Sequence, residues 1–112
     1  MAPASCDPIV SFRKECAENI SEYPSDSDWV NQSSEWLKRA FDHKFMYNFS
    51  WMGRPIIQLP NDILAMQELI WQTKPDLIIE TGIAHGGSLI LSASMLSLLD
   101  YCDAVEQGTM LD

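Results

Sequence analysis

Apolar side chains recur at spacings of three and four in the first part of the chain, and this pattern predicts two helices. The first covers residues 8–20, and a polar turn over residues 21–28 separates it from a second helix that begins at Trp29. The apolar face of the second helix carries two tryptophans, Trp29 and Trp36. Such a face is typical of core packing or of a contact between subunits.

The next stretch, residues 43–60, loses the helical period. Aromatic residues alternate there with other side chains until residues 53–55 break the alternation. We predict an irregular, partly extended segment that packs against the following domain. Three of its side chains could also shape the wall of a pocket: Tyr47, Trp51 and Arg54.

The second half of the chain predicts a helix, a buried strand, a glycine loop and another helix. The first of these helices begins near Asn61 or Asp62, either of which can cap it, and ends at Lys74-Pro75. Residues 76–80 are a short apolar run typical of a central parallel strand. The helix after Ser88 is apolar around much of its girth, so it needs cover on more than one side.

Charge and cysteine content narrow the range of partners. The net charge is −9, and residues 59–112 hold eight acidic residues but a single base, Lys74. A nucleic-acid partner is therefore not expected, because phosphate binding needs Lys and Arg. The three cysteines show no zinc-ligand spacing, which favours reduced thiols. Without a recognisable signal peptide or an apolar run of about 20 residues, we expect a cytoplasmic protein with no membrane span.

The strongest candidate for a binding site is the stretch Glu80-Thr81-Gly82-Ile83-Ala84-His85-Gly86-Gly87-Ser88. It lies between the expected strand and a helix, as glycine loops that bind nucleotide-like cofactors do. A phosphate-binding P-loop needs a lysine directly after its final glycine. Here Ser88 follows Gly87, and no Lys or Arg comes after Lys74. This sequence excludes ATP or GTP hydrolysis at the loop.

Two cofactor motifs and a purely structural turn stay open for this loop. A dinucleotide fingerprint, G-x-G-x-x-G, would have glycine where Ala84 stands, and the extra methyl group would approach the pyrophosphate. The S-adenosylmethionine loop of class I methyltransferases, E/D-x-G-x-x-x-G, matches Glu80, Gly82 and Gly86. That cofactor has no phosphates and carries a sulfonium cation, so the acidic surroundings suit it. His85 could act as a base or could hydrogen-bond the backbone or the cofactor.

Two stretches, residues 47–58 and 75–88, resemble signatures of the cephalosporin hydroxylase / rhamnosyl O-methyltransferase family. The likeness extends from about Asp7 to about Asp103. It implies an α/β, doubly wound methyltransferase fold that follows a helical N-terminal region, and some members of the family form oligomers. The hydroxylase name is historical and does not indicate oxygen chemistry.

The resemblance also implies a domain division and a set of site residues. Residues 1–58 would form a helical and irregular extension, and residues 59–112 would begin a Rossmann-like domain that we expect to be incomplete. Members of the family bind S-adenosylmethionine. The cofactor-binding residues implied by the family loop are Glu80, Gly82, Ala84, His85, Gly86 and Ser88.

Metal and catalytic residues cannot be assigned on the same basis. The family resembles O-methyltransferases that use a divalent metal, usually magnesium, but its metal-binding carboxylates and its ribose-binding acid lie beyond the residues matched here. Asp100, Asp103 and Glu106 stand at about the right distance for the ribose acid, yet no apolar strand precedes them. We therefore expect an N-terminal portion of the enzyme, with the Mg²⁺ ligands outside this chain.

The function that the resemblance implies is S-adenosylmethionine-dependent O-methylation, with a sugar or a secondary metabolite as the hydroxyl acceptor. The expected partners are that small-molecule or glycan acceptor and, in a homo-oligomer, a second copy of the chain. An alternative is a non-catalytic fragment that acts as an oligomerisation or protein-interaction module through Trp29, Trp36 and Phe41. A third possibility is that the isolated chain is not stably folded, because one strand cannot make a sheet.

Overall fold

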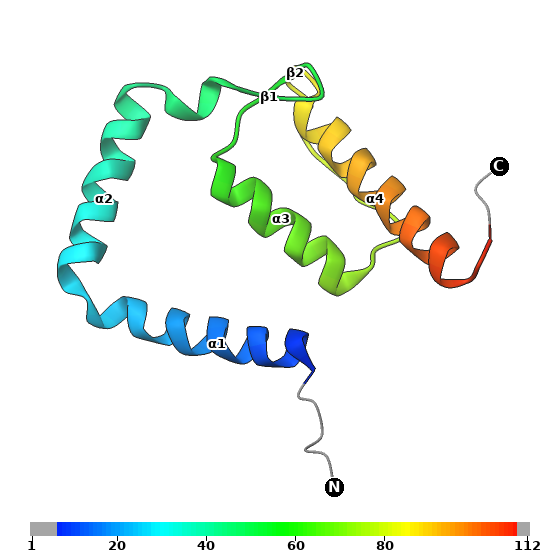
Figure 1. Cartoon of the computed structure of the whole chain (residues 1–112). Helices are drawn as coiled ribbons and strands as arrows, with labels where there is room; N and C mark the ends of the chain where they lie inside the picture. The colour runs from blue at the N-terminus through cyan, green and yellow to red at the C-terminus, as the bar shows by residue number, and fades with distance from the viewer. Residues whose placement is uncertain (1–6, 110–112) are drawn as a thin grey trace, which may run out of the picture. The chain divides into compact units, whose positions relative to one another are not determined.

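The computed structural model describes residues 7–109. These residues form four α-helices, two short 3₁₀ helices and one antiparallel pair of strands (Figure 1). The order along the chain is α1 (Pro8–Glu22), η1 (Tyr23–Ser25), α2 (Ser27–Asp42), η2 (Phe45–Tyr47), β1 (Phe49–Trp51), β2 (Arg54–Ile56), α3 (Pro60–Thr73) and α4 (Gly87–Glu106). The chain divides into two compact units, Met1–Arg39 and Ala40–Asp112.

In the first unit, an aspartate caps the N-terminus of each helix: Asp7 caps α1 and Asp26 caps α2. The Ile9 amide donates to Asp7 Oδ1 at 2.9 Å, and the Trp29 amide donates to Asp26 Oδ1 at 3.0 Å. The ring of Tyr23 meets that of Trp29 edge-on, with centroids 4.6 Å apart. Both predicted helices and the polar turn between them are therefore confirmed.

The apolar faces of these two helices are not covered within the described chain. Helix α1 contains no buried residue, and Trp29 and Trp36 are 47% and 53% exposed. Core packing was one interpretation of the two tryptophans, and residues 7–109 do not provide it. The alternative interpretation, a contact between subunits, stays a prediction.

Strands β1 and β2 form a hairpin in the segment for which the sequence predicted only an irregular, partly extended conformation. Met52 and Gly53 make its two-residue turn with φ angles of 47° and 82°, the positive values that such tight turns require. The strands pair Phe49 with Ile56 and Trp51 with Arg54. The residues that break the aromatic alternation are thus the turn and the second strand of a hairpin.

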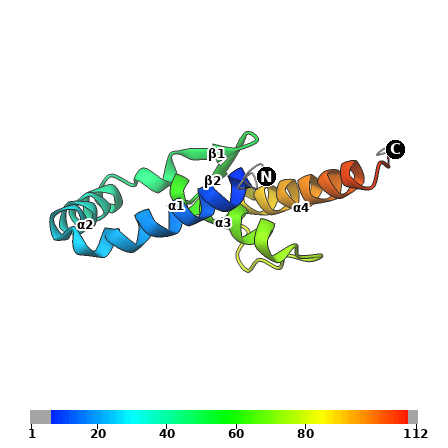
Figure 2. The same cartoon turned by 60° about the horizontal axis from the view of Figure 1, so that its bottom comes forward.

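The hairpin packs on the N-terminal end of α4, and Figures 1 and 2 show the two side by side in both views. Ile56 from β2 and Leu91 from α4 are the most deeply buried large side chains among residues 7–109, at 1% and 2% exposure. The Trp51 indole N–H donates to Ser94 Oγ at 3.1 Å. Gly87 permits this close approach, because a Cβ atom there would overlap the Pro55 carbonyl oxygen.

Helix α3 confirms the predicted helix but begins differently. Its N-cap is Leu59, which makes no side-chain capping bond, so the expected caps at Asn61 or Asp62 are wrong. Pro60 opens the helix instead, because its fixed φ suits the first turn and its missing N–H is not needed there. The helix ends as predicted at Lys74, which adopts φ 46° and places its ammonium 2.6 Å from the centre of the Trp71 ring.

The strand expected over residues 76–80 is not formed. This segment has no strand partner among residues 7–109, where the hairpin is the only sheet. A strand exists only when its backbone N–H and C=O groups pair with a neighbour. Leu77 and Ile79 are accordingly 71% and 81% exposed. The structure is therefore mostly helical, and the Rossmann-like strand–loop–helix is not confirmed.

Helix α4 confirms the predicted helix after the glycine loop and extends to Glu106. Its expected cover is incomplete within residues 7–109: Leu98 is 55% exposed and Val105 is 61% exposed. By length and composition alone this helix could cross a membrane, a test that core helices of soluble proteins also pass. The expected absence of a membrane span and the expected domain boundary after residue 58 both stay predictions.

Candidate functional site

The segment from Glu80 to Gly86 forms a loop that glycine conformations shape. Gly82 and Gly86 have φ angles of 81° and 84°, which side-chain-bearing residues rarely adopt. Ala84 also has a positive φ, 46°, at a cost of about 1 kcal/mol for a residue with a Cβ. The Gly86 amide donates to the Ile83 carbonyl oxygen at 2.8 Å and closes a turn. The loop thus leads directly into the first turn of α4.

Several backbone amides of the loop have no protein acceptor. Within residues 7–109, the N–H groups of Gly82, Ile83 and Ala84 make no hydrogen bond. Residues 81–85 are exposed, so these amides belong to a loop that solvent and ligands can reach. Gly86, the N-cap of α4, offers no side chain to satisfy the first amides of that helix. The loop therefore presents a set of hydrogen-bond donors to a ligand.

Glu80 is the only carboxylate of the loop, and two serines of α4 hold it. Ser88 Oγ donates to Glu80 Oε2 at 3.0 Å, and Ser92 Oγ donates to Glu80 Oε1 at 2.6 Å. The serines are four residues apart, so they lie on one face of the helix, one above the other. Ser92 is buried and Glu80 is half-buried. Each carboxylate oxygen can still accept a further hydrogen bond, for example from an ammonium group.

Arg54 brings a positive charge from the hairpin to the loop. Its Nη1 donates to the His85 carbonyl oxygen at 3.4 Å. Its side chain also lies beside Gly86, with Cδ 3.8 Å from the position that a Cβ on Gly86 would take. The sequence marked Arg54 as a candidate pocket residue but did not indicate this contact. The sequence did contain a signal for this contact: no Lys or Arg follows Lys74, so a cation next to the loop has to come from an earlier part of the chain.

The predicted site residues therefore lie together, although not all of them interact. Glu80 and Ser88 are joined by a hydrogen bond, whereas Gly82, Ala84 and Gly86 shape the loop between them. The His85 side chain is exposed and makes no hydrogen bond within residues 7–109, so a role as a base stays a prediction. Ser92 was missed by the sequence analysis.

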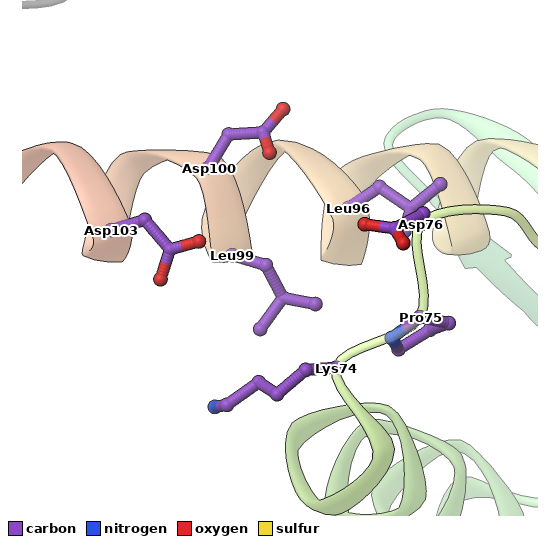
Figure 3. A pocket seen from close by; sticks show the side chains of 7 residues that line it. All are labelled: Lys74, Pro75, Asp76, Leu96, Leu99, Asp100 and Asp103. Carbon is purple, nitrogen blue, oxygen red and sulfur yellow. The ribbon is translucent and has the colours of Figure 1, made fainter.

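The acids considered for ribose binding lie elsewhere. Asp100, Asp103 and Glu106 are on α4, not after a strand. Asp100 and Asp103 help to line a cavity of about 200 Å³, together with Lys74 and Asp76. In Figure 3 the Asp103 side chain points toward the side of α4 where Lys74 lies, whereas the Asp100 side chain points away from it. This cavity lies between the end of α3 and the C-terminal half of α4, and no residue of the glycine loop lines it.

The described residues do not fit a metal site. Across residues 7–109, no group of three or more His, Cys, Asp or Glu side chains comes together in a way that could hold an ion. Divalent cations such as magnesium need several oxygen ligands. We therefore assign no metal-binding residue and derive no chemical step through a metal.

Comparison with known proteins places the chain in a family. The family model described as Rhamnosyl O-methyltransferase/CmcI matches residues 43–109, which run from the segment before the hairpin to the end of α4. The chain belongs to this family. The matched rhamnosyl O-methyltransferase/CmcI region includes the hairpin, the loop and the two serines of α4, and it is O-methyltransferase-related. No curated protein and no solved structure matches the chain.

Proposed function

We propose that the chain supplies the donor-binding loop of an S-adenosylmethionine-dependent O-methyltransferase. Membership of the rhamnosyl O-methyltransferase/CmcI family supports methyl transfer to oxygen. The observation that carries the assignment to the loop is the Glu80 carboxylate, which Ser88 and Ser92 hold at the base of a loop with exposed amides.

The chemistry of the loop suits this cofactor. When bound, S-adenosylmethionine supplies a methyl group on a sulfonium cation. Glu80 would accept hydrogen bonds from the ammonium of its amino-acid end, because a carboxylate with spare lone pairs pairs well with a cation. The exposed amides from Gly82 to Ala84 would donate to its oxygen atoms. Residues 75–112 contain no Lys or Arg, so the loop and α4 themselves contribute no such cation that would repel a sulfonium; Arg54 reaches the loop from the hairpin.

The acceptor is proposed to be a hydroxyl of a sugar or a secondary metabolite. The family description names a rhamnosyl O-methyltransferase, which supports a sugar hydroxyl in particular. Metal assistance stays outside this proposal, because residues 7–109 do not provide the ligands.

Calorimetric titration with S-adenosylmethionine tests the proposal through Glu80→Gln. This change keeps the shape of the side chain but removes the negative charge. The amide oxygen can accept from one serine, and the amide NH2 can donate to the hydroxyl oxygen of the other. A hydrogen bond to a charged group contributes about 1.5–3 kcal/mol, so the dissociation constant should rise about tenfold to a hundredfold. The matched control is Glu68→Gln, an exposed position in the middle of α3.

The control should bind like the wild type, and both variants should unfold at the wild-type temperature. If Glu80→Gln binds S-adenosylmethionine as tightly as Glu68→Gln does, the role of the loop in holding the donor is wrong.

A further inference from the structure

Arg54 has an unused capacity to bind an anion. It is exposed on β2, and the one hydrogen bond of its side chain within residues 7–109, to the His85 carbonyl oxygen, is long at 3.4 Å. No carboxylate in the described part of the chain forms an ion pair with it. The guanidinium is always charged and presents parallel N–H donors that match the two oxygens of a carboxylate.

The position of Arg54 relative to the loop is fixed by packing. The hairpin that carries it packs on α4, where Pro55 and Ile56 lie against Gly87 and Ile56 is almost fully buried. The hydrogen bond from Trp51 to Ser94 adds a second tie between the same two elements. Arg54 pairs directly with Trp51 across the hairpin, so the hydrogen bond from Trp51 to α4 also holds the backbone of Arg54 in place.

The charge distribution leaves Arg54 as the positive side chain next to the loop. Residues 75–112 contain six acidic residues and no Lys or Arg. Lys74 is the nearest base along the chain, but its ammonium lies over the Trp71 ring and its side chain lines the cavity of Figure 3. Among residues 7–109, Arg54 is therefore the positive side chain that contacts the loop, and a ligand that brings a carboxylate to the loop would meet it.

We propose that Arg54 binds the carboxylate of the amino-acid end of S-adenosylmethionine. This inference rests on the proposed function, because it takes the donor to be bound at the loop. The amino-acid end carries both an ammonium and a carboxylate. Glu80 receives the ammonium and Arg54 receives the carboxylate, so the hairpin and the loop together recognise this part of the donor. When the ligand binds, the Arg54 guanidinium either gives up its hydrogen bond to the His85 carbonyl oxygen or donates to that oxygen and to the ligand carboxylate together.

Calorimetry with two ligands separates this role from a structural one. S-adenosylmethionine carries the carboxylate, whereas decarboxylated S-adenosylmethionine keeps the ammonium and the sulfonium but lacks it. Arg54→Gln should weaken the binding of S-adenosylmethionine about tenfold to a hundredfold, the range for a hydrogen-bonded charged pair. The same variant should bind the decarboxylated ligand at least as tightly as the wild type does.

Two further variants complete the design. Arg54→Lys should recover part of the affinity for S-adenosylmethionine, because it restores the charge without the planar fork. Arg39→Gln removes an exposed arginine from the last turn of α2 and should change neither affinity.

The possible results have distinct meanings. If Arg54→Gln weakens both ligands equally, the side chain only supports the loop and the inference is wrong. If it weakens neither, the carboxylate binds elsewhere and the inference is equally wrong, while the donor-binding function stands. If the wild type binds neither ligand, the proposed function fails and the inference falls with it.

Discussion

Gly87 should tolerate no side chain, because it forms the contact surface between α4 and the hairpin. A Cβ atom at this position would overlap the Pro55 carbonyl oxygen and lie 2.8 Å from Ile56 Cβ. Both neighbours resist movement: the carbonyl is backbone inside a paired strand, and Ile56 is 1% exposed. The substitution Gly87→Ala must therefore displace the hairpin from the helix.

The expected size of the effect follows from two opposing terms. Forcing an extra methyl group into a packed contact costs about 1–3 kcal/mol. Alanine is a better helix former than glycine by up to about 1 kcal/mol, but that benefit is smaller at the first residue of a helix. The contact with backbone places the cost toward the upper end of its range. We therefore expect Gly87→Ala to lower the free energy of unfolding by about 1–3 kcal/mol.

Urea unfolding followed by circular dichroism and tryptophan fluorescence measures this change. Gly82 provides an informative contrast, because a Cβ there would meet no atom within 4 Å although its φ is 81°. Asparagine tolerates that conformation, so Gly82→Asn should cost less than 1 kcal/mol, roughly, whereas Gly87→Asn should be at least as damaging as Gly87→Ala. A Gly87→Ala variant as stable as the wild type would refute the close packing of hairpin and helix.

Two other substitutions test the polar contacts of the described chain. Ser92→Ala should lower the free energy of unfolding by about 1–2 kcal/mol in urea, because it leaves one oxygen of the half-buried Glu80 carboxylate without its 2.6 Å partner. Ser97→Ala, at an exposed position of the same helix, is the control and should change little. Asp7→Ala should weaken the start of α1 by about 1 kcal/mol, seen as lost helical chemical shifts at residues 8–12 in NMR spectra, whereas Asp7→Asn should retain them. Equal spectra for both Asp7 variants would contradict the cap.

The helices could be predicted from sequence because each satisfies its own backbone hydrogen bonds. Their apolar period is visible locally, and a breaker such as Lys74-Pro75 marks an end without reference to the rest of the fold. The prediction of a strand over residues 76–80 was wrong because a strand, unlike a helix, cannot satisfy its own backbone hydrogen bonds. Its apolar composition is suitable, but a strand depends on neighbours that residues 7–109 do not contain.

The hairpin was missed because its signals are weak. Each strand has three residues, and the turn uses Met52-Gly53 where Asn-Gly or Asp-Gly is the usual pattern. Met52 adopts the positive φ that the turn requires, a conformation that its residue type does not indicate. The packing of the strands on α4 joins segments distant in sequence, which no local rule reveals. The contact of Arg54 with the loop follows from the same packing and was hidden for the same reason.

The candidate site was predictable in its backbone and less so in its side chains. The spacing of Glu80, Gly82 and Gly86 identified the loop, and two of these residues adopt the positive φ values that require glycine. The spacing of four between Ser88 and Ser92 in the mostly apolar first half of α4 was the available signal for the two hydroxyls that hold Glu80. That signal has meaning only once the helix is known to turn this face toward the loop.

A calorimetric titration of the wild-type chain with S-adenosylmethionine tests most directly whether this loop holds the methyl donor. We expect saturable binding at one site per chain, which Glu80→Gln weakens at least about tenfold. Binding should also raise the unfolding temperature of the chain, because the ligand stabilises the folded state. A titration that shows no binding, together with an unchanged unfolding temperature at saturating ligand, would contradict the claim that this loop holds the methyl donor.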